Sequence, residues 1–388
     1  MIDFFLNQEQ RMLREMVRDF ASNEITPVVS ELDEKGEFPS AIIAKMGALG
    51  LMGIPFPEDY GGSGMDYVSY STAVFEIGKV CASTAITMAA HTSLGMTPIY
   101  LVGTEDQKRR YLPPLASGEM IGAFGLTEEG AGSDAAATKT TAIREGGEWI
   151  LNGGKVFTTN AGKAGIITVT AKVLEDGDDK GIGAFIIEAD NPGLKISPPE
   201  KKMGWNASDT CQIFFEDLRL SSKQLLGEPA EGFRTFLKTL MTGRISIGAL
   251  SCGTAEGAYR AALNYSNERE AFGKPIHRFQ SVGFKLSQMA TEIEASKLLV
   301  YQAAKKYDEG HSVVREAAMA KLFASETAMR TATEAIQVFG GYGYIKEYPA
   351  ERYFRDAKVL TIGEGTSEVQ KIVILREILK SLDRAISF

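Results

Sequence analysis

Cysteine and histidine are both scarce in this chain of 388 residues. The three cysteines, Cys81, Cys211 and Cys252, lie far apart, and neither a CxxC pair nor a Cys/His ligand spacing occurs. This excludes a disulfide framework and a zinc ribbon, and an odd, small count fits a reducing cytoplasm, where we expect the protein to lie. With only three histidines, chemistry that needs several imidazoles is poorly supported, and we expect no metal site.

Long apolar runs and an excess of positive charge are also missing. Charged residues interrupt every hydrophobic run well before the roughly 18 residues of a membrane span, and the N-terminal segment has no apolar core of signal-peptide length. The chain has 42 Lys and Arg against 50 Asp and Glu, a formal net charge of −8, which argues against binding nucleic acid by bulk charge. We therefore expect neither a membrane span nor a nucleic-acid partner.

The pattern of residues predicts three parts. Residues 1–118 have helical spacing, with helices expected over 66–80 and 83–101 and with Pro113-Pro114 marking the end of this part. Residues 119–230 contain short β-branched and aromatic runs separated by Gly, Asn and Asp clusters, which is typical of antiparallel strands, and no helical pattern alternates with them. Long amphipathic helices return over 231–388. The expected class is α+β and multidomain: an N-terminal helical domain, a middle antiparallel β domain and a C-terminal helical bundle domain.

A glycine-rich segment, Phe124–Asp134, opens the middle part. Small residues let backbone N–H groups approach an anion closely, and Thr127 and Ser133 add hydroxyl donors. It is neither a P-loop nor a dinucleotide fingerprint, because it lacks the Gly-Lys-Ser/Thr sequence and the strand–helix context. A plain turn between two domains is the alternative.

Three further segments combine aromatic, basic and glycine residues. Phe157–Asn160 follows a predicted strand, and its ring could stack on a flat heterocycle, although a core aromatic would look the same. Arg269–Ile276 joins two helices, and Arg269 could either pair with a phosphate or cap a helix end. The glycines of Gln337–Tyr344 allow close approach of a ligand or simply stop a helix.

The segment Thr361–Glu368 contains the strongest candidate for acid–base chemistry. Glu364 lies between two glycines in an otherwise apolar stretch, where loss of hydration disfavours the charged carboxylate and moves its pKa toward the range of a general base. An exposed turn glutamate is the alternative. His91 lies on a predicted helix without a nearby carboxylate, so a structural role is the simpler interpretation for it.

Taken together, these motifs resemble those of one family, the acyl-CoA dehydrogenases, in order and over essentially the whole chain. The matching segments are Phe124–Asp134, Lys155–Gly162, Glu268–Ile276, Gln337–Tyr344 and Gly363–Glu368. The resemblance implies a C-terminal four-helix bundle, a homotetramer, non-covalent FAD, an acyl-CoA substrate and electron delivery to electron-transferring flavoprotein.

The resemblance also implies roles for particular residues. Glu364 corresponds to the catalytic base, because Gly243 occupies the other place where the family carries one. The implied substrate contacts are Ser133, Arg244, Gly365, His91 and Leu94. The implied FAD contacts are Phe124, Leu126, Thr127, Ser133, Phe157, Thr159, Thr366 and Glu368 within the subunit, and Arg269, Phe272, Gln280, Gln337, Gly340 and Gly341 toward the FAD of a neighbouring subunit.

The implied reaction is α,β-dehydrogenation of an acyl-CoA thioester. Many members have tyrosine where this chain has Gly363, so we expect room for a short branched or cyclic acyl group. The same base and flavin would serve an enoyl-CoA reductase, and the same scaffold could be a catalytically silent flavoprotein, although Glu364 argues against the latter. Sequence does not set the direction of the reaction.

Overall fold

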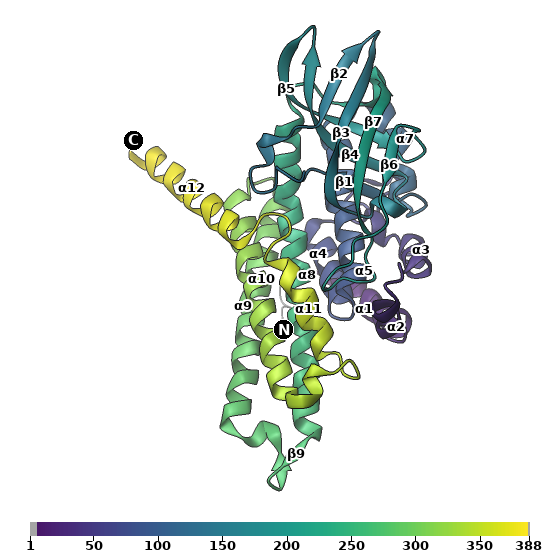
Figure 1. Ribbon diagram of the computed structural model, residues 1–388. Coiled ribbons are helices and arrows are strands. Elements are labelled where there is room, and N and C mark those ends of the chain that lie inside the picture. Colours follow the sequence, from purple (N-terminus) through teal and green to yellow (C-terminus); the bar gives the residue numbers. More distant parts are fainter. Residues whose placement is uncertain (1–5, 387–388) are drawn as a thin grey trace.

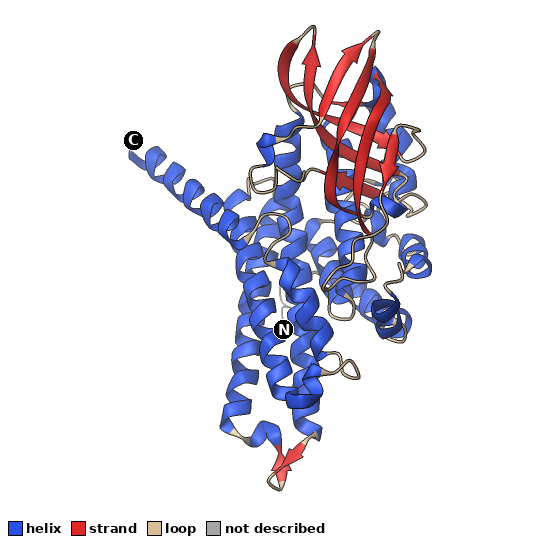
Figure 2. Ribbon diagram, viewed as in Figure 1, coloured by secondary structure: helices blue, strands red, loops and turns tan. Residues whose placement is uncertain are grey.

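The computed structural model describes residues 6–386, in which helices form both ends of the chain and a sheet forms the middle. Figure 2 shows the sheet at one end of the molecule and long helices at the other. This succession of helices, strands and helices confirms the expected fold class. Among the described helices, none is long and apolar enough to cross a membrane.

The first part is helical, as expected, but its second half is less regular than the sequence suggested. The predicted helix over 83–101 is divided by a π-helical segment, Ala90–Met96. The two prolines that were expected to end this part lie inside a helix instead, which begins at a capping box formed by Thr104 and Gln107. Its α-helices are α1 (Gln8–Phe20), α2 (Val29–Lys35), α3 (Ser40–Ala48), α4 (Tyr67–Gly78), α5 (Ala82–Ala89), α6 (Thr97–Val102) and α7 (Glu105–Ala116).

The middle part is a mixed sheet, so the expectation of purely antiparallel strands was wrong in one respect. Two strands, β1 and β2, both pair in parallel with β4, at its beginning and toward its end respectively. The chain reaches β4 only after the β2–β3 hairpin, so parallel pairing arises without a crossover helix. The strands are β1 (Gly122–Gly125), β2 (Thr141–Glu145), β3 (Glu148–Thr159), β4 (Ile166–Glu175), β5 (Asp178–Glu188), β6 (Leu194–Ile196), β7 (Thr210–Ser221) and β8 (Leu225–Leu226).

The last part is built on α8 (Gly232–Glu268), α9 (Gln280–Asp308), α10 (Val314–Phe339) and α11 (Ala350–Leu360), while α12 (Ser367–Ile386) projects away from the body (Figure 1). A short hairpin of β9 (Glu270–Ala271) and β10 (Lys274–Pro275) joins α8 to α9 at the far end. The buried face of α10 is mostly alanine rather than the Leu322, Met329 and Ile336 stripe that the spacing suggested. Small side chains let α8 and α10 pack closely.

A shared hydrophobic cluster fixes the three parts to one another. It contains Met96 and Leu115 from the N-terminal helices, Ile166 and Ile186 from the sheet, and Phe236 from α8. Phe236 also stacks on Phe124 at the end of β1, with ring centroids 4.1 Å apart. The C-terminal end of β1 is therefore held against the beginning of α8.

The loop that follows β1 is anchored by a buried ion pair. Lys155 Nζ donates to Glu128 Oε1 at 2.6 Å, and Lys155 is completely buried. Glu128 also accepts from the Lys139 and Thr140 backbone N–H groups and from the Thr138 hydroxyl. Burial alone would raise the pKa of Glu128, but the bonds from Lys155, Thr138 and Lys139 hold it at about 2.

We predict that Lys155→Met destabilises the protein strongly, because it leaves the Glu128 carboxylate buried without its partner. Breaking a buried pair typically costs about 3–5 kcal/mol, so the midpoint of thermal unfolding at pH 7 should fall clearly. Lys180→Met, which removes an exposed lysine paired with Asp178, is the matched control and should change the midpoint little. Equal effects of the two substitutions would contradict this role.

Candidate functional site

Glu364 lies in a tight turn between α11 and α12. Both Glu364 and Gly365 have positive φ, at 53° and 91°, a region that glutamate rarely adopts. The turn is closed by the Gly363 N–H donating to the Val359 carbonyl at 2.8 Å and by the Ser367 N–H donating to the Thr361 carbonyl at 3.0 Å. Such a conformation costs about 1–3 kcal/mol, so the surrounding contacts must impose it.

The carboxylate of Glu364 is directed into the protein. Its Oε2 atom is shielded from solvent and has no hydrogen-bond partner among the described residues. Burial raises the pKa of Glu364 to about 7, while the positive charges of Lys321 and Arg244 act in the opposite direction. A carboxylate with this pKa can hold or accept a proton near neutral pH, as a general base must.

Gly243 and Leu94 define the space around this carboxylate. A Cβ atom on Gly243 would lie 2.2 Å from Glu364 Oε2 and 2.9 Å from Leu94 Cδ2. Any side chain at position 243 would therefore displace the glutamate. The family that the sequence resembles carries its base at a position corresponding to Gly243 or to Glu364. Here a side chain at position 243 would exclude the Glu364 carboxylate, beside which Leu94 lies.

Arg244 follows on α8 and is also buried. Its Nε atom has no partner among the described residues, and burial lowers the pKa of Arg244 from its ordinary value while the charge of Glu364 raises it. The backbone N–H of Glu364 is likewise not matched by any acceptor within residues 6–386. The Arg244 Nε donor and the Glu364 Oε2 acceptor, both buried and without partners among the described residues, indicate a place for a polar ligand.

The ring nitrogens of His91, in contrast, both have hydrogen-bond partners. Its Nδ1 accepts the Gly122 backbone N–H at 2.9 Å, so Nε2 carries the hydrogen and donates to the Leu115 carbonyl at 3.0 Å. Burial lowers the pKa of His91 to about 4, which keeps the ring neutral. Both ring nitrogens therefore join the π-helical segment to β1 and α7, which supports the structural role, and a contact of His91 with substrate stays a prediction.

The glycine-rich loop after β1 is open to solvent where a ligand could approach. Ser133 is exposed, and Leu126 and Thr127 are partly buried near the strand end. A Cβ atom on Gly130 or Gly132 would meet nothing within 4 Å. The Thr127 carbonyl accepts the Val156 N–H at 2.8 Å, which ties the loop to β3.

Phe157 lies on β3 close to this loop and is unusual in two ways. Its side chain is 68% exposed although it is aromatic, and its φ is 56°. The pairing of β3 with β7 slips between Lys155 and Thr158, so Phe157 occupies a bulge that turns the ring outward. Thr159 is partly buried at the strand end. An exposed ring on a rigid strand suits stacking on a planar ligand.

The remaining residues that the family resemblance implies as FAD contacts lie in two separate places. Thr366 caps α12 through a bond from the Val369 N–H at 3.3 Å, and Glu368 is exposed in its first turn, next to Glu364. The others lie at the opposite end of the bundle. Arg244 and Arg269 are separated by 25 residues of one straight helix, about 37 Å. These distant residues are Arg269, Phe272, Gln280, Gln337, Gly340 and Gly341.

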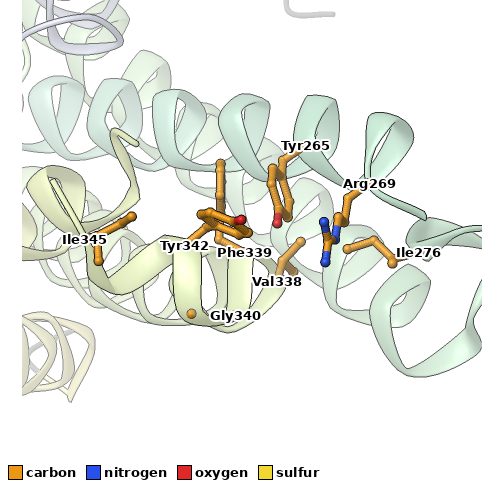
Figure 3. Close-up of a pocket in the computed structure, with 9 residues that line it drawn as sticks. Tyr265, Arg269, Ile276, Val338, Phe339, Gly340, Tyr342 and Ile345 are labelled. Atoms are coloured by element: carbon orange, nitrogen blue, oxygen red, sulfur yellow. The ribbon is translucent and has the colours of Figure 1, made fainter. Parts of the chain in front are cut away.

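Figure 3 shows the hollow at this distant end, about 430 Å³ in volume, formed by Tyr265 and Arg269 of the α8 end and by the segment after α10. The Arg269 guanidinium lies 5.8 Å from the ring centroid of Tyr342. Phe272, at the tip of the β9–β10 hairpin, is 96% exposed. Within one subunit these residues cannot reach the turn of Glu364.

Comparison with known proteins identifies the scaffold. The family models for the N-terminal, middle and C-terminal domains of acyl-CoA dehydrogenase match residues 7–119, 123–218 and 230–379. The chain belongs to the acyl-CoA dehydrogenase family. This family is FAD-dependent.

Three curated relatives cover the chain almost completely. A probable acyl-CoA dehydrogenase of Bacillus subtilis is 52% identical over 98% of this chain and 100% of its own length. A short-chain specific acyl-CoA dehydrogenase of Clostridium acetobutylicum is 46% identical, with the same coverage. A 3-(aryl)acrylate reductase of Clostridium sporogenes is 44% identical over 97% of this chain and 100% of its own.

Two solved structures are similar throughout. Butyryl-CoA dehydrogenase of Megasphaera elsdenii superposes with a TM-score of 0.94 at 43% identity, covering 96% of this chain and 99% of its own. A chain in a structure described as the electron-transferring flavoprotein of Acidaminococcus fermentans gives 0.94 at 47% identity, covering 96% and 98%.

Sequence reasoning missed two residues that contact the turn of this acyl-CoA dehydrogenase, Lys321 and Gln370. Lys321 Nζ donates to the Gly365 carbonyl at 2.8 Å, and Gln370 Nε2 donates to the same carbonyl at 2.9 Å. A signal for Lys321 existed. It shares the helical spacing of Ala317, Ala324 and Ala328, all buried, so it is a lysine on an apolar face.

We predict that the raised pKa of the Glu364 carboxylate can be detected in the pH dependence of the stability of the folded protein. Glu364 has a pKa of about 7 in the folded protein against 4.5 ordinarily, so between these values only the folded state holds the proton. Wild-type stability should therefore fall relative to Glu364→Gln as pH rises from 4.5 to 7, and the difference should stay constant above that. Thermal unfolding of both proteins from pH 4.5 to 8.5 measures this difference in stability. If stability depended on pH in the same way in both proteins, the raised pKa of Glu364 would be contradicted.

Proposed function

We propose that this acyl-CoA dehydrogenase acts on a short acyl-CoA, with a preference for a branched or cyclic acyl group, and passes its electrons to electron-transferring flavoprotein. The observation that carries the reaction is the buried, unpaired carboxylate oxygen of Glu364 beside Gly243. Glu364 removes the α-proton of the thioester. Bound FAD supplies the acceptor for the hydride from the β-carbon.

The residues of the chain fit FAD at the sheet end of the molecule. Phe157 offers an exposed ring, Thr158 Oγ1 is buried without a partner, and the loop around Gly130 and Gly132 leaves open space for a phosphate-bearing group. We propose that Phe124, Leu126, Thr127, Ser133, Phe157, Thr159, Thr366 and Glu368 line this FAD site.

The chain must also make the α-proton more acidic, since a free thioester holds it too tightly for a carboxylate. The unpaired Glu364 backbone N–H is available to donate to the thioester carbonyl as negative charge develops there. One such donor contributes about 3–4 kcal/mol in other enzymes. Arg244 and Leu94 lie next to the carboxylate, and we assign them to the CoA side and the acyl side of the substrate.

A homotetramer explains the distant group of residues. Arg269, Gly340 and Gly341 line a hollow that cannot serve the FAD of its own subunit, and Phe272 is almost completely exposed. We propose that this end, with Gln280 and Gln337, contacts the FAD of a neighbouring subunit. The three cysteines are free and buried, which fits a cytoplasmic enzyme.

The electron partner and the acyl group rest on separate observations. The likeness to a chain in the A. fermentans electron-transferring flavoprotein structure supports that partner. For the acyl group, a Cβ atom on Gly363 would meet only the Val359 carbonyl, at 3.6 Å, so the absence of a side chain there is not required by close packing. A neighbouring aromatic ring could fill the space at Gly363 instead, but Trp205 is packed in the helical core and Tyr344 is 85% exposed, so we expect neither ring there.

Reduction of an enoyl thioester is the second candidate. It is favoured by the 44% identity to a 3-(aryl)acrylate reductase. The same base would then return a proton to the α-carbon. An assay of the saturated thioester with an artificial electron acceptor and an assay of the unsaturated thioester with an artificial electron donor separate the two directions.

We predict that Glu364→Gln keeps bound FAD and its fold but lowers turnover by about 10²–10⁴-fold, the usual contribution of a positioned base. Anaerobic bleaching of the flavin by an acyl-CoA measures the reductive half-reaction directly. Glu37→Gln, an exposed glutamate far from the turn, is the control and should bleach normally. Rapid bleaching in Glu364→Gln would assign the base elsewhere.

We predict that Gly363→Tyr narrows the acyl site. Gly363 has no left-handed φ, so tyrosine is tolerated by the backbone. The ratio of kcat/KM for cyclohexanecarbonyl-CoA and 2-methylbutyryl-CoA to that for butyryl-CoA should fall about 10–200-fold, because a misfit of one methylene costs about 1–3 kcal/mol.

Ile362→Tyr adds the same ring at the adjacent, exposed position and should leave the ratio unchanged. If the wild-type enzyme itself prefers butyryl-CoA or hexanoyl-CoA, the assignment of a branched or cyclic acyl group is wrong.

A further inference from the structure

We propose that Lys321 is a positioning residue for the base: its buried ammonium holds the Gly365 carbonyl, and its charge stabilises the carboxylate form of Glu364. This rests on the proposed role of Glu364. Lys321 lies on α10, whereas the turn lies between α11 and α12, so the lysine joins the bundle to the base.

The contacts of Lys321 differ from those of the other buried lysines. Among the described residues three lysines are buried, and two of them bond directly to a carboxylate, Lys155 to Glu128 at 2.6 Å and Lys297 to Glu256 at 2.9 Å. Lys321 is completely buried, but its Nζ donates to a backbone carbonyl, that of Gly365. A buried ammonium without a bonded anion is costly, so a nearby negative charge must compensate it.

Glu364 provides that charge. Burial lowers the pKa of Lys321 to about 8, and the charge of Glu364 opposes this change. The same attraction favours the ionised form of Glu364 against the effect of burial. The bond to the Gly365 carbonyl fixes the ammonium beside the turn that carries Glu364.

Gln370 holds the same turn without adding charge. Its Nε2 donates to the Glu364 carbonyl at 3.1 Å and to the Gly365 carbonyl at 2.9 Å. Gly365 has a φ of 91°, which strains any residue with a side chain, and a Cβ atom there would also lie 2.7 Å from this nitrogen. The two side chains together impose the left-handed backbone that directs the Glu364 carboxylate toward Gly243.

Other ionisable groups surround the pair and are unchanged in the test below. Arg244 on α8 adds a second positive charge, and the phenol of Tyr70 on α4, whose pKa burial raises, stays neutral. The charges of Glu326, Glu368 and Arg376, on α10 and α12, also act on Lys321 or Arg244. Of these groups only Lys321 combines a positive charge with a bond to the turn.

The test compares three substitutions through the pH profile of kcat/KM. Lys321→Gln keeps a donor but removes the charge, so the acid limb should move to higher pH by about one unit or more, with turnover largely recovered above it. Lys321→Met should move the limb and also lower the plateau. Gln370→Met should lower the plateau without moving the limb.

Lys297→Met is the matched control, because it removes another buried lysine of the bundle and should leave the acid limb in place. An unmoved limb in Lys321→Gln overturns the proposal, as does an equal movement in Lys297→Met. If Lys321→Met does not fold, Lys321→Gln decides the role of the charge.

A second readout does not require activity. The pH range over which Lys321→Gln loses stability relative to the double variant Lys321→Gln/Glu364→Gln should lie above the range found for wild type against Glu364→Gln. An unchanged range overturns the proposal. Failure of wild type to reduce its flavin with any acyl-CoA would instead overturn the proposed function and leave this measurement valid.

Discussion

The candidate site depends on keeping one carboxylate oxygen, Glu364 Oε2, out of water without a hydrogen-bond partner among the described residues. Only a glycine at position 243 leaves room for this atom. This arrangement is unfavourable by itself, since it combines desolvation with a left-handed backbone. It persists because Lys321 and Gln370 hold the two carbonyls of the turn and because α8 and α10 pack closely.

The sheet and the N-terminal helices are arranged around the same requirement. His91 binds the Gly122 N–H and the Leu115 carbonyl, so the segment that carries Leu94 is fixed to β1. Phe124 at the end of β1 stacks on Phe236 of α8. The glycine-rich loop, anchored by Glu128 and Lys155, therefore begins close to the helix that carries Gly243 and Arg244. The proposed flavin-binding loop and the proposed base, which come from separate parts of the chain, are thereby connected through β1 and α8.

The distant hollow lies at the other end of the bundle from the turn that carries Glu364. The long helices of the bundle separate Arg244 from Arg269 by about 37 Å, too far for both to contact one ligand within a subunit. A helix of this length is therefore suited to presenting one end to its own site and the other to a neighbour. The exposed apolar residues Ile372, Leu375, Leu379 and Leu382 on the projecting α12 are also unpartnered within the described chain, which agrees with a protein that buries surface on assembly.

The sequence by itself determined the order of the three parts and the family, because periodicity and glycine-flanked motifs are local properties, and it predicts Glu364 as the base. Three features could not be determined from the sequence. The helix α7 continues through two prolines, and β1 and β2 pair in parallel with β4. The buried face of α10 consists mostly of alanines rather than of Leu322 and Met329. Nor did the sequence place Lys321 at the turn that carries Glu364. Those outcomes depend on which backbone groups and charges meet from segments far apart in the chain. Only the tertiary structure decides which backbone groups a buried polar side chain meets, those of Gly122 and Leu115 for His91 and that of Gly365 for Lys321.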